Sequence, residues 1–304
     1  MIQNKTIIAL VCILLLSACG TDIEKEALIQ KYTNPNSKFI TLDGNRVHYR
    51  DEGKGEVLVL LHGTASSLHT WDEWAQRLSQ QYRVIRVDLP GFGLTGPDRE
   101  HRYEVSDDVA FLHDFLAGVA LDSVHLVGSS LGGRIAWEYS LVYQDKVKTL
   151  TLMNSLGYPQ KKWPPAIEMA QWPLMDTLMS HFSPRFLYEL GLKEVYFNQE
   201  QVNDDVVDRY YELSRYPGNL DAFPRRVKAK LDTESYKIAQ ISVPTLILWG
   251  KEDLYFPVEN AHHFHQDIRD SRLYVYQNVG HLPMEEVPEN SLKDFLEFIS
   301  SQVN

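Results

Sequence analysis

A serine flanked by glycines is the residue of this chain best placed for nucleophilic chemistry. Residues 128–133 read Gly-Ser-Ser-Leu-Gly-Gly, which puts Ser130 at the centre of a G-x-S-x-G pattern. An apolar run at 124–127 precedes the pattern and a helical stretch follows it. The serine is therefore expected on a sharp turn between a strand and a helix, where its hydroxyl acts as a nucleophile.

The two glycines explain how such a turn is possible. Side chains on either side of the serine would collide on a strained strand-to-helix turn, so Gly128 and Gly132 leave the room that exposes the hydroxyl of Ser130. Ser129 is the competing hydroxyl, but it occupies the variable position of the pattern. We expect its side chain to point elsewhere.

A serine hydroxyl is a poor nucleophile at neutral pH and needs a base. Among 11 histidines the leading candidate is His281, which follows the strand predicted at 273–276. A carboxylate must hold the imidazole and stabilise its positive charge, and Asp253 follows the strand predicted at 245–249. Asp253 is therefore the predicted acid, with Glu252 as the second choice.

Short runs rich in Val, Leu and Ile predict the strands that position these groups. They cover residues 39–42, 46–49, 57–61, 84–87, 124–127, 147–152, 245–249 and 273–276. The first two flank a Gly-containing turn and predict a hairpin, whereas the others are mostly separated by helical stretches. This alternation predicts an α/β fold with a mostly parallel sheet and helices on both faces.

From about residue 39 to its end, the chain resembles the α/β-hydrolase superfamily. The nucleophile, the acid and the base follow one another in the order of that fold. The resemblance implies an oxyanion hole made by two backbone N–H groups. One belongs to Leu131, directly after the nucleophile, and the other to Thr64, in a His-Gly-Thr turn that resembles the family's oxyanion turn. The serine nucleophile argues against epoxide hydrolases and haloalkane dehalogenases, which use aspartate.

The strand pattern is absent between residues 156 and 240. Aromatic and Met-containing segments interrupted by prolines predict a helical insertion there, which divides the core into residues 38–155 and 241–304. By resemblance to capped lipases, esterases and carbon–carbon hydrolases, the insertion is a cap over the site. Its candidates for enclosing an apolar substrate are Trp163, Trp172, Met175, Met179, Phe182 and Phe186.

The first residues are typical of a secretory signal. Residues 1–18 contain a short apolar run that ends in Leu-Ser-Ala-Cys, which resembles a bacterial lipoprotein cleavage box. The resemblance implies that Cys19 carries the lipid and anchors the protein in the bacterial cell envelope. Gly20 in place of Asp favours the outer membrane. Residues 19–37 are interpreted as a lipidated N-terminus and tether, partly helical, and an ordinary signal without lipid is the alternative.

Composition restricts the other classes of function. The net charge of −11 makes nucleic acid an unexpected partner. Cys12 and Cys19 both lie in the N-terminal segment, which excludes disulfides and cysteine-ligated zinc within the predicted fold. No phosphate-binding loop indicates a nucleotide cofactor. Three histidines at 262, 263 and 265 lack a matching carboxylate pattern, so no metal site is predicted.

These features predict a serine ester hydrolase, an esterase or a lipase, that acts through an acyl-enzyme intermediate. Its partner is a small-molecule or lipid ester, because a lipid-anchored envelope enzyme meets esters and lipids. A carbon–carbon bond hydrolase, an amide hydrolase and a perhydrolase can use the same triad and remain alternatives. A non-catalytic binding protein on the same scaffold would not react with a fluorophosphonate probe at Ser130.

Overall fold

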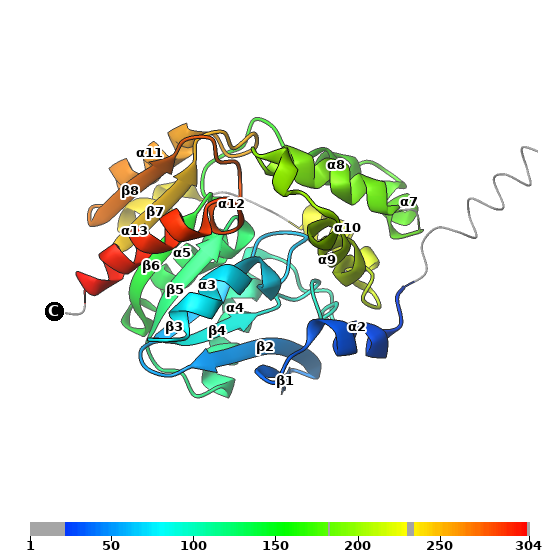
Figure 1. Ribbon diagram of the computed structural model, residues 1–304, viewed down its shortest axis with the longest axis horizontal. Helices are drawn as coiled ribbons and strands as arrows, with labels where there is room; N and C mark the ends of the chain where they lie inside the picture. Colours follow the sequence, from blue (N-terminus) through cyan, green and yellow to red (C-terminus); the bar gives the residue numbers. More distant parts are fainter. Residues whose placement is uncertain (1–21, 182, 230–233, 303–304) are drawn as a thin grey trace, which may run out of the picture.

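An eight-stranded sheet forms the centre of the molecule (Figure 1). The computed structural model describes residues 22–302 apart from 182 and 230–233. The strands lie in the order β1-β2-β4-β3-β5-β6-β7-β8. They are β1 (Ser37–Leu42), β2 (Asn45–Gly53), β3 (Val57–Leu61), β4 (Arg83–Val87), β5 (Val124–Ser129), β6 (Val147–Met153), β7 (Thr245–Gly250) and β8 (Ser271–Tyr276).

The first two strands form the predicted hairpin, and β2 also pairs antiparallel with β4. Asp43 (φ 48°) and Gly44 (φ 78°) make its two-residue turn. A type I′ turn requires positive φ at both positions, and its twist matches that of the flanking strands. From β4 to β8 all neighbouring strands are parallel, so the predicted mostly parallel sheet is confirmed.

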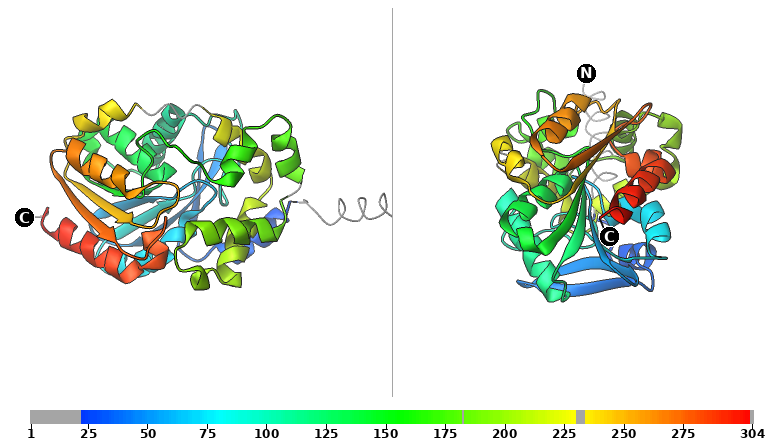
Figure 2. Two further views of the ribbon diagram at one scale, coloured as in Figure 1. Left: turned by 90° about the horizontal axis from the view of Figure 1, so that it is seen from above. Right: turned by 90° about the vertical axis from the view of Figure 1, so that its left-hand side faces the viewer.

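Helices cover both faces of the sheet, as the end-on view in Figure 2 shows. One face packs against α4, α5 and α11, and the other packs against α3 and α13. These helices are α3 (Asp72–Leu78), α4 (Val105–Gly118), α5 (Leu131–Val142), α11 (Val258–Asp267) and α13 (Pro288–Ser300). In β3, Val59 and Leu61 belong to the first core and Leu58 and Leu60 to the second. Burial on both faces explains why the strands are continuous apolar runs.

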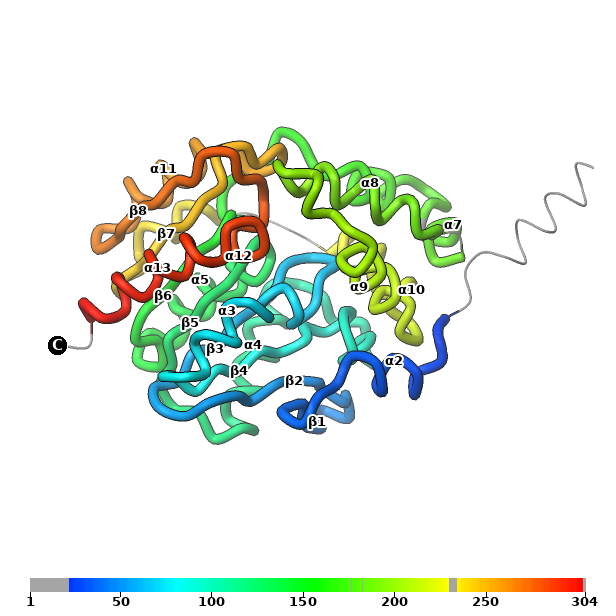
Figure 3. The backbone as a smooth tube through the Cα atoms, in the orientation of Figure 1, coloured from blue at the N-terminus to red at the C-terminus, as the bar shows by residue number. Residues whose placement is uncertain are grey.

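Among the described residues between β6 and β7 there are five α-helices, within the segment predicted as a helical insertion (Figure 3). They are α6 (Pro165–Ala170), α7 (Met175–His181), α8 (Arg185–Val195), α9 (Asp204–Ser214) and α10 (Asn219–Lys228). We call them the cap helices. Short 3₁₀ turns, Gln199–Gln201 and Ser235–Gln240, complete the segment. No helix in the described part of the chain is both long and apolar enough to cross a bilayer.

A buried ion pair joins the cap helices to the core. Both Asp108 carboxylate oxygens, on α4, lie 2.7 Å from Nη2 of Arg226, on α10. Burial raises the pKa of Asp108 to about 6, although the Arg226 charge acts in the opposite direction. Because both side chains are almost inaccessible to solvent, the loss of either one would leave the other charge buried without its partner.

The segment interpreted as a tether contains a packed helix, α2 (Lys25–Tyr32). Leu28 and Tyr32 are buried with apolar side chains of the α9 region. Lys31 Nζ lies 2.7 Å from a Glu212 carboxylate oxygen, and the Tyr32 hydroxyl donates to the same carboxylate at 2.8 Å. The short charged sequence did not predict this packing, because its apolar contacts come from residues far along the chain.

Candidate active site

Ser130 lies on the predicted turn between β5 and α5. Its φ of 54° is rare for a residue with a side chain and costs on the order of 1–3 kcal/mol. Three backbone hydrogen bonds hold it: its N–H donates to Met153 O at 3.0 Å, and its carbonyl accepts from the N–H groups of Arg134 and Leu156 at 3.1 Å. The nucleophile candidate therefore has a backbone conformation imposed by its surroundings.

The neighbouring glycines have the steric role predicted for them. A Cβ atom at Gly128 would lie 2.2 Å from Gly132 O, and one at Gly132 would lie 2.4 Å from Leu61 O. Such contacts leave no room for any side chain. Ser130 is partly exposed, whereas Ser129 is fully buried, so the predicted difference between the two hydroxyls is present in the structure.

Asp253 and His281 are in direct contact. The Asp253 Oδ2 atom lies 2.6 Å from His281 Nδ1, after β7 and β8 respectively. The other carboxylate oxygen accepts hydrogen bonds from the backbone N–H groups of Tyr255 at 2.9 Å and Phe256 at 3.1 Å. A carboxylate with these partners accepts only, so Nδ1 of the imidazole carries the proton and Nε2 is free to act as a base.

Asn154 is a site residue that the sequence did not reveal. Its amide Nδ2 donates to Asp253 Oδ2 at 2.6 Å, and its Oδ1 accepts from Gly250 N at 3.1 Å. Asn154 follows β6, which lies between β5 and β7. The sequence does place a polar residue directly after this strand. The role of Asn154, however, depends on its hydrogen bond to Asp253, which lies 99 positions later in the sequence.

The loop that carries His281 is also held by the cap segment. His281 N–H donates to Val195 O at 2.8 Å. Glu286 accepts from Gly280 N with one carboxylate oxygen and from Phe197 N with the other, both at 2.8 Å. Burial raises the pKa of Glu286, which these backbone donors oppose. Glu286 was likewise not predicted, and it ties the histidine loop to the end of α8.

A second carboxylate on the same short helix, α12 (Pro283–Glu286), binds α9. Glu285 forms an ion pair with Arg209 and accepts hydrogen bonds from the hydroxyls of Tyr196 at 2.6 Å and Tyr210 at 2.8 Å. The Tyr210 hydroxyl in turn lies 3.4 Å from the Ser66 hydroxyl, in the loop after the predicted oxyanion turn. The cap helices, the histidine loop and the oxyanion loop are thereby connected.

The predicted oxyanion turn lies against the nucleophile. A Cβ atom at Gly63 would be 3.0 Å from Ser130 Cβ and 3.5 Å from its Oγ. His62 is fully buried, and burial lowers its pKa to about 4. Its Nε2 accepts from Leu89 N at 3.0 Å, so the proton on Nδ1 donates to Gly63 O at 2.7 Å. This contact orients the Gly63–Thr64 peptide group.

Two backbone N–H groups beside Ser130 are candidates for the oxyanion hole. In a trans peptide the C=O and N–H point in opposite directions, so the Thr64 N–H is directed away from the His62 ring. Leu131 is the first residue of α5, where N–H groups have no partner within the helix and the helix dipole favours negative charge. Such an arrangement can stabilise the oxyanion of a tetrahedral intermediate.

Ser130 and His281 make no hydrogen bond to each other in the structure, although both are among the described residues. Ser130 follows β5, and the Asp253–His281 pair follows β7 and β8 at the same edge of the sheet. Contacts between a nucleophile and its base commonly tighten when substrate binds. Cys19, the predicted lipidation site, lies outside the described residues.

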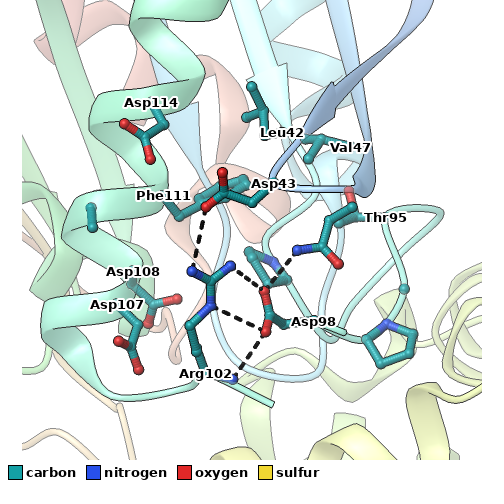
Figure 4. A pocket seen from close by; sticks show the side chains of 15 residues that line it. Leu42, Asp43, Val47, Thr95, Asp98, Arg102, Asp107, Asp108, Phe111 and Asp114 are labelled. Atoms are coloured by element: carbon teal, nitrogen blue, oxygen red, sulfur yellow. Dashed lines mark hydrogen bonds and ion pairs between the residues drawn. The ribbon is translucent and has the colours of Figure 1, made fainter. Parts of the chain in front are cut away.

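A small acidic cavity lies elsewhere, between the β1–β2 hairpin and α4 (Figure 4). Its volume is about 70 Å³, and Arg102 is one of the side chains that line it. Arg102 pairs with Asp98 at 3.1 Å and with Asp43 at 3.4 Å, and the Asn45 amide donates to Asp98 at 2.8 Å. These carboxylates have structural partners. Within the described ranges, no three or more His, Cys, Asp or Glu side chains form a group that could hold a metal ion.

The sequence is similar to those of hydrolases from other organisms. The chain is 28% identical over 277 residues to 2-hydroxy-6-oxo-6-(2'-aminophenyl)hexa-2,4-dienoic acid hydrolase of Metapseudomonas resinovorans, covering 88% of this chain and 92% of that protein. It is 27% identical to 2-hydroxy-6-oxo-2,4-heptadienoate hydrolase of Pseudomonas putida, covering 89% and 99%.

A solved structure and a family match lead to the same fold. The structure of a serine hydrolase involved in carbazole degradation superimposes with a TM-score of 0.75 at 26% identity, covering 87% of this chain and 98% of that one. Residues 56–288 match the family described as alpha/beta hydrolase fold. That range is more than half of the chain, and the protein is a hydrolase that belongs to the alpha/beta hydrolase fold family.

Proposed function

We propose that this protein is a serine hydrolase in which Ser130 attacks a carbonyl carbon, His281 is the base and Asp253 orients the histidine. The observation that carries the proposal is the 2.6 Å contact between Asp253 and His281 at the sheet edge that also carries the strained Ser130. Thr64 and Leu131 supply the oxyanion donors. These assignments agree with the residues predicted from the sequence.

The proposed reaction has two halves. Ser130 Oγ adds to the carbonyl carbon as His281 Nε2 takes its proton, and the backbone N–H groups of Thr64 and Leu131 stabilise the oxyanion. The bond beside the carbonyl then breaks, and its electron pair and the proton from His281 go to the leaving group. Water, deprotonated by His281, releases the acid from the acyl-enzyme and restores Ser130.

Carbon–carbon bond hydrolysis is the first substrate class to test. The named relatives act on 2-hydroxy-6-oxo-dienoic acids, in which a ketone supplies the carbonyl carbon. Similarity to them covers nearly nine-tenths of this chain. This support replaces the preference for esters that the sequence suggested, because that preference depended on the expected location of the protein.

Carboxylic esters are the second class, and apolar side chains of the inserted segment, beginning with Trp163 just before α6, favour them. Trp163 contacts Phe256, whose ring lies 5.0 Å from that of His281, so apolar side chains extend from the cap to the catalytic histidine. Such a lining suits an aliphatic acyl chain. The triad serves both classes, since each begins with addition of a serine to a carbonyl group.

One assay separates the two classes. The kcat/KM of the purified protein would be measured for a 2-hydroxy-6-oxo-6-phenyl dienoate and for p-nitrophenyl esters of increasing chain length. We expect at least a tenfold preference for the dienoate. The opposite preference would assign the protein to the esterases. Turnover of either substrate that persists in Ser130→Ala, or failure of a fluorophosphonate to label Ser130, would contradict the triad itself.

We also propose that Cys19 carries a lipid that holds the protein in the bacterial envelope, with the outer membrane favoured. The support is the sequence pattern around the cysteine, since the residue lies outside the described part of the chain. Labelled palmitate should be incorporated into the wild-type protein and not into Cys19→Ser. Equal incorporation into both proteins would contradict the anchor.

A further inference from the structure

Apolar side chains are exposed on the outer side of the cap helices. Of the eleven large apolar side chains that the described residues expose, eight lie between Met169 and Phe197. Six of them lie on α7 and α8 or directly before α7, and we call these six the outer apolar face: Trp172, Leu174, Leu178, Phe186, Leu187 and Leu190. Single exposed apolar residues need no explanation, but such a concentration marks a surface with a partner.

Helix α8 shows that this exposure is not a side effect of core packing. Its inner side carries Tyr188, Leu192 and Val195, which pack against the second core. Phe186 and Leu190, one turn apart, project from the opposite side and are 55% and 57% exposed. A helix that is apolar on both sides is expected between two apolar environments, and only one of them is the protein interior.

The described chain begins close to this face. Ile23 N donates to Arg215 O at 3.0 Å, and the guanidinium of the same Arg215 donates to Ser183 O, in the α7–α8 turn, at 2.9 Å. Figures 1 and 2 accordingly show α2 and the cap helices at the same end of the molecule. Arg215 therefore links the start of the described chain to Ser183, between α7 and α8.

Chain length then limits where a lipid on Cys19 can lie. Cys19 is three positions before Asp22, and a fully extended chain spans at most about 3.6 Å per position, or about 11 Å in total. An acyl anchor at Cys19 would hold the α7–α8 turn at the membrane surface. We call the edge of the sheet that carries Ser130, Asp253 and His281 the site edge. It lies beyond the cap helices and would remain in the aqueous phase.

We propose that the outer apolar face inserts into the lipid bilayer that holds the N-terminal anchor, so that the cap helices are a membrane-contacting surface. The inference goes beyond the proposed hydrolase activity and relies on the proposed lipid at Cys19. The driving force is apolar burial. A groove of about 720 Å³ beside α7 is lined by Arg102, Arg225 and Lys228 but also by Glu104, Asp107 and Asp221, so it offers no net attraction to anionic lipid.

Tryptophan fluorescence tests the contact directly. Trp71, Trp74, Trp137 and Trp249 are fully buried, whereas Trp172 is 60% exposed on the outer apolar face. The full-length lipidated protein would be reconstituted into phosphatidylcholine vesicles with or without brominated acyl chains. The emission of Trp172 is the difference between the wild-type protein and Trp172→Phe. We expect brominated acyl chains to quench more than half of this emission, and to quench it equally in 0.5 M NaCl.

Matched variants make the test specific. Leu178→Asp and Phe186→Asp should each reduce the quenching of Trp172 at least twofold. Val142→Asp should leave the quenching of Trp172 unchanged. Val142 is also exposed, at 61%, but it lies at the end of α5 and not on the cap helices. Ser130→Ala should also retain full quenching, so a failure of the hydrolase proposal would not alter this result.

Three results would overturn the inference. One is Trp172 emission that is quenched by aqueous acrylamide and not by brominated lipid. Another is quenching that requires anionic lipid and disappears in salt. The third is a protein that is dimeric in detergent, is made monomeric by Leu178→Asp, and shows no quenching of Trp172 by brominated lipid. That result would assign the outer apolar face to a second copy of the chain.

Discussion

The site edge of the sheet and the cap helices are built in opposite ways. At the site edge, Ser130, Asp253 and His281 are held by short hydrogen bonds from backbone and buried side chains. The strand that leads to the nucleophile, β5, is buried at every position. In the cap, α8 contributes a single fully buried side chain, Leu192, and exposes several large apolar ones.

The two regions also differ in how they are joined. Main-chain pairing between strands holds the site edge together, whereas the cap is joined to the core by side-chain packing and by two ion pairs, Arg226–Asp108 and Arg209–Glu285. Buried ion pairs depend on both partners and tolerate little change in geometry. We infer that the sheet edge determines which reaction occurs, and that the cap determines which molecules reach it.

The largest effect should come from the nucleophile. Ser130→Ala is expected to lower kcat by about 10⁶, or about 8 kcal/mol of transition-state stabilisation, because no other group supplies the attacking oxygen. Ser129→Ala is the matched control, since its buried hydroxyl has no hydrogen-bond partner in the structure. Steady-state kinetics on the preferred substrate measures both, and equal losses in the two variants would contradict the assignment.

A smaller loss is expected when the acid becomes an amide. Asp253→Asn should lower kcat by about 10⁴, because an asparagine at the 2.6 Å contact no longer favours the proton on Nδ1 of His281. Glu252→Gln changes the adjacent carboxylate, which accepts a hydrogen bond from Val279 N, and should keep activity within about threefold of wild type. If Glu252→Gln showed the larger loss, the acid would be the neighbour instead.

The sequence predicted those parts of the site that depend on local geometry. Ser130 was found because a strand-to-helix turn requires Gly128 and Gly132, and these steric contacts are present. His281 and Asp253 were found because each follows a predicted strand, and the structure brings the two into contact. Their catalytic roles remain the proposal that the experiments above address.

Long-range partners were not predictable in this way. Asn154 binds Asp253, 99 positions away, and Glu286 joins its neighbour Gly280 to Phe197, 89 positions away; nothing in their local sequence specifies those distant partners. The packing of α2 was missed for the same reason, since Tyr32 contacts Glu212 across 180 positions. Local patterns predict strands and turns, whereas the contacts that stabilise the site depend on the three-dimensional arrangement.

The junction between cap and core offers a test of stability. Arg226→Met removes the counter-charge of the buried Asp108 and should cost about 3–5 kcal/mol in the free energy of unfolding at pH 8. Arg225→Met, at the exposed neighbouring position, should cost less than about 0.5 kcal/mol. Urea denaturation followed by circular dichroism measures both.

The effect of pH on this junction has a definite sign. The pKa of Asp108 is about 6 in the folded chain, above the ordinary value of 3.8. Protonation of Asp108 therefore stabilises the fold fully below about pH 4, and this contribution is lost as the pH rises through about 6. Without Arg226 the pKa rises further, so the penalty of Arg226→Met should be smaller at pH 5 than at pH 8. A penalty that does not depend on pH would show that Asp108 is not the group left uncompensated.

The smallest expected effect concerns substrate selection by the cap. Trp163 is the cap side chain that contacts Phe256 beside His281, whereas Trp172 lies on the outer apolar face. Trp163→Ala should widen the apolar lining, and each methylene newly accommodated contributes about 0.8 kcal/mol, or about fourfold in kcat/KM. Rates for p-nitrophenyl esters should therefore rise for long chains relative to short ones.

Trp172→Ala, assayed without membranes, should leave the chain-length profile unchanged because that side chain faces away from the core. If Trp163→Ala altered the rates for short and long esters by the same factor while the variant remained folded, the cap would not select the acyl chain. The division between a sheet edge that determines the reaction and a cap that determines the substrate would then be wrong.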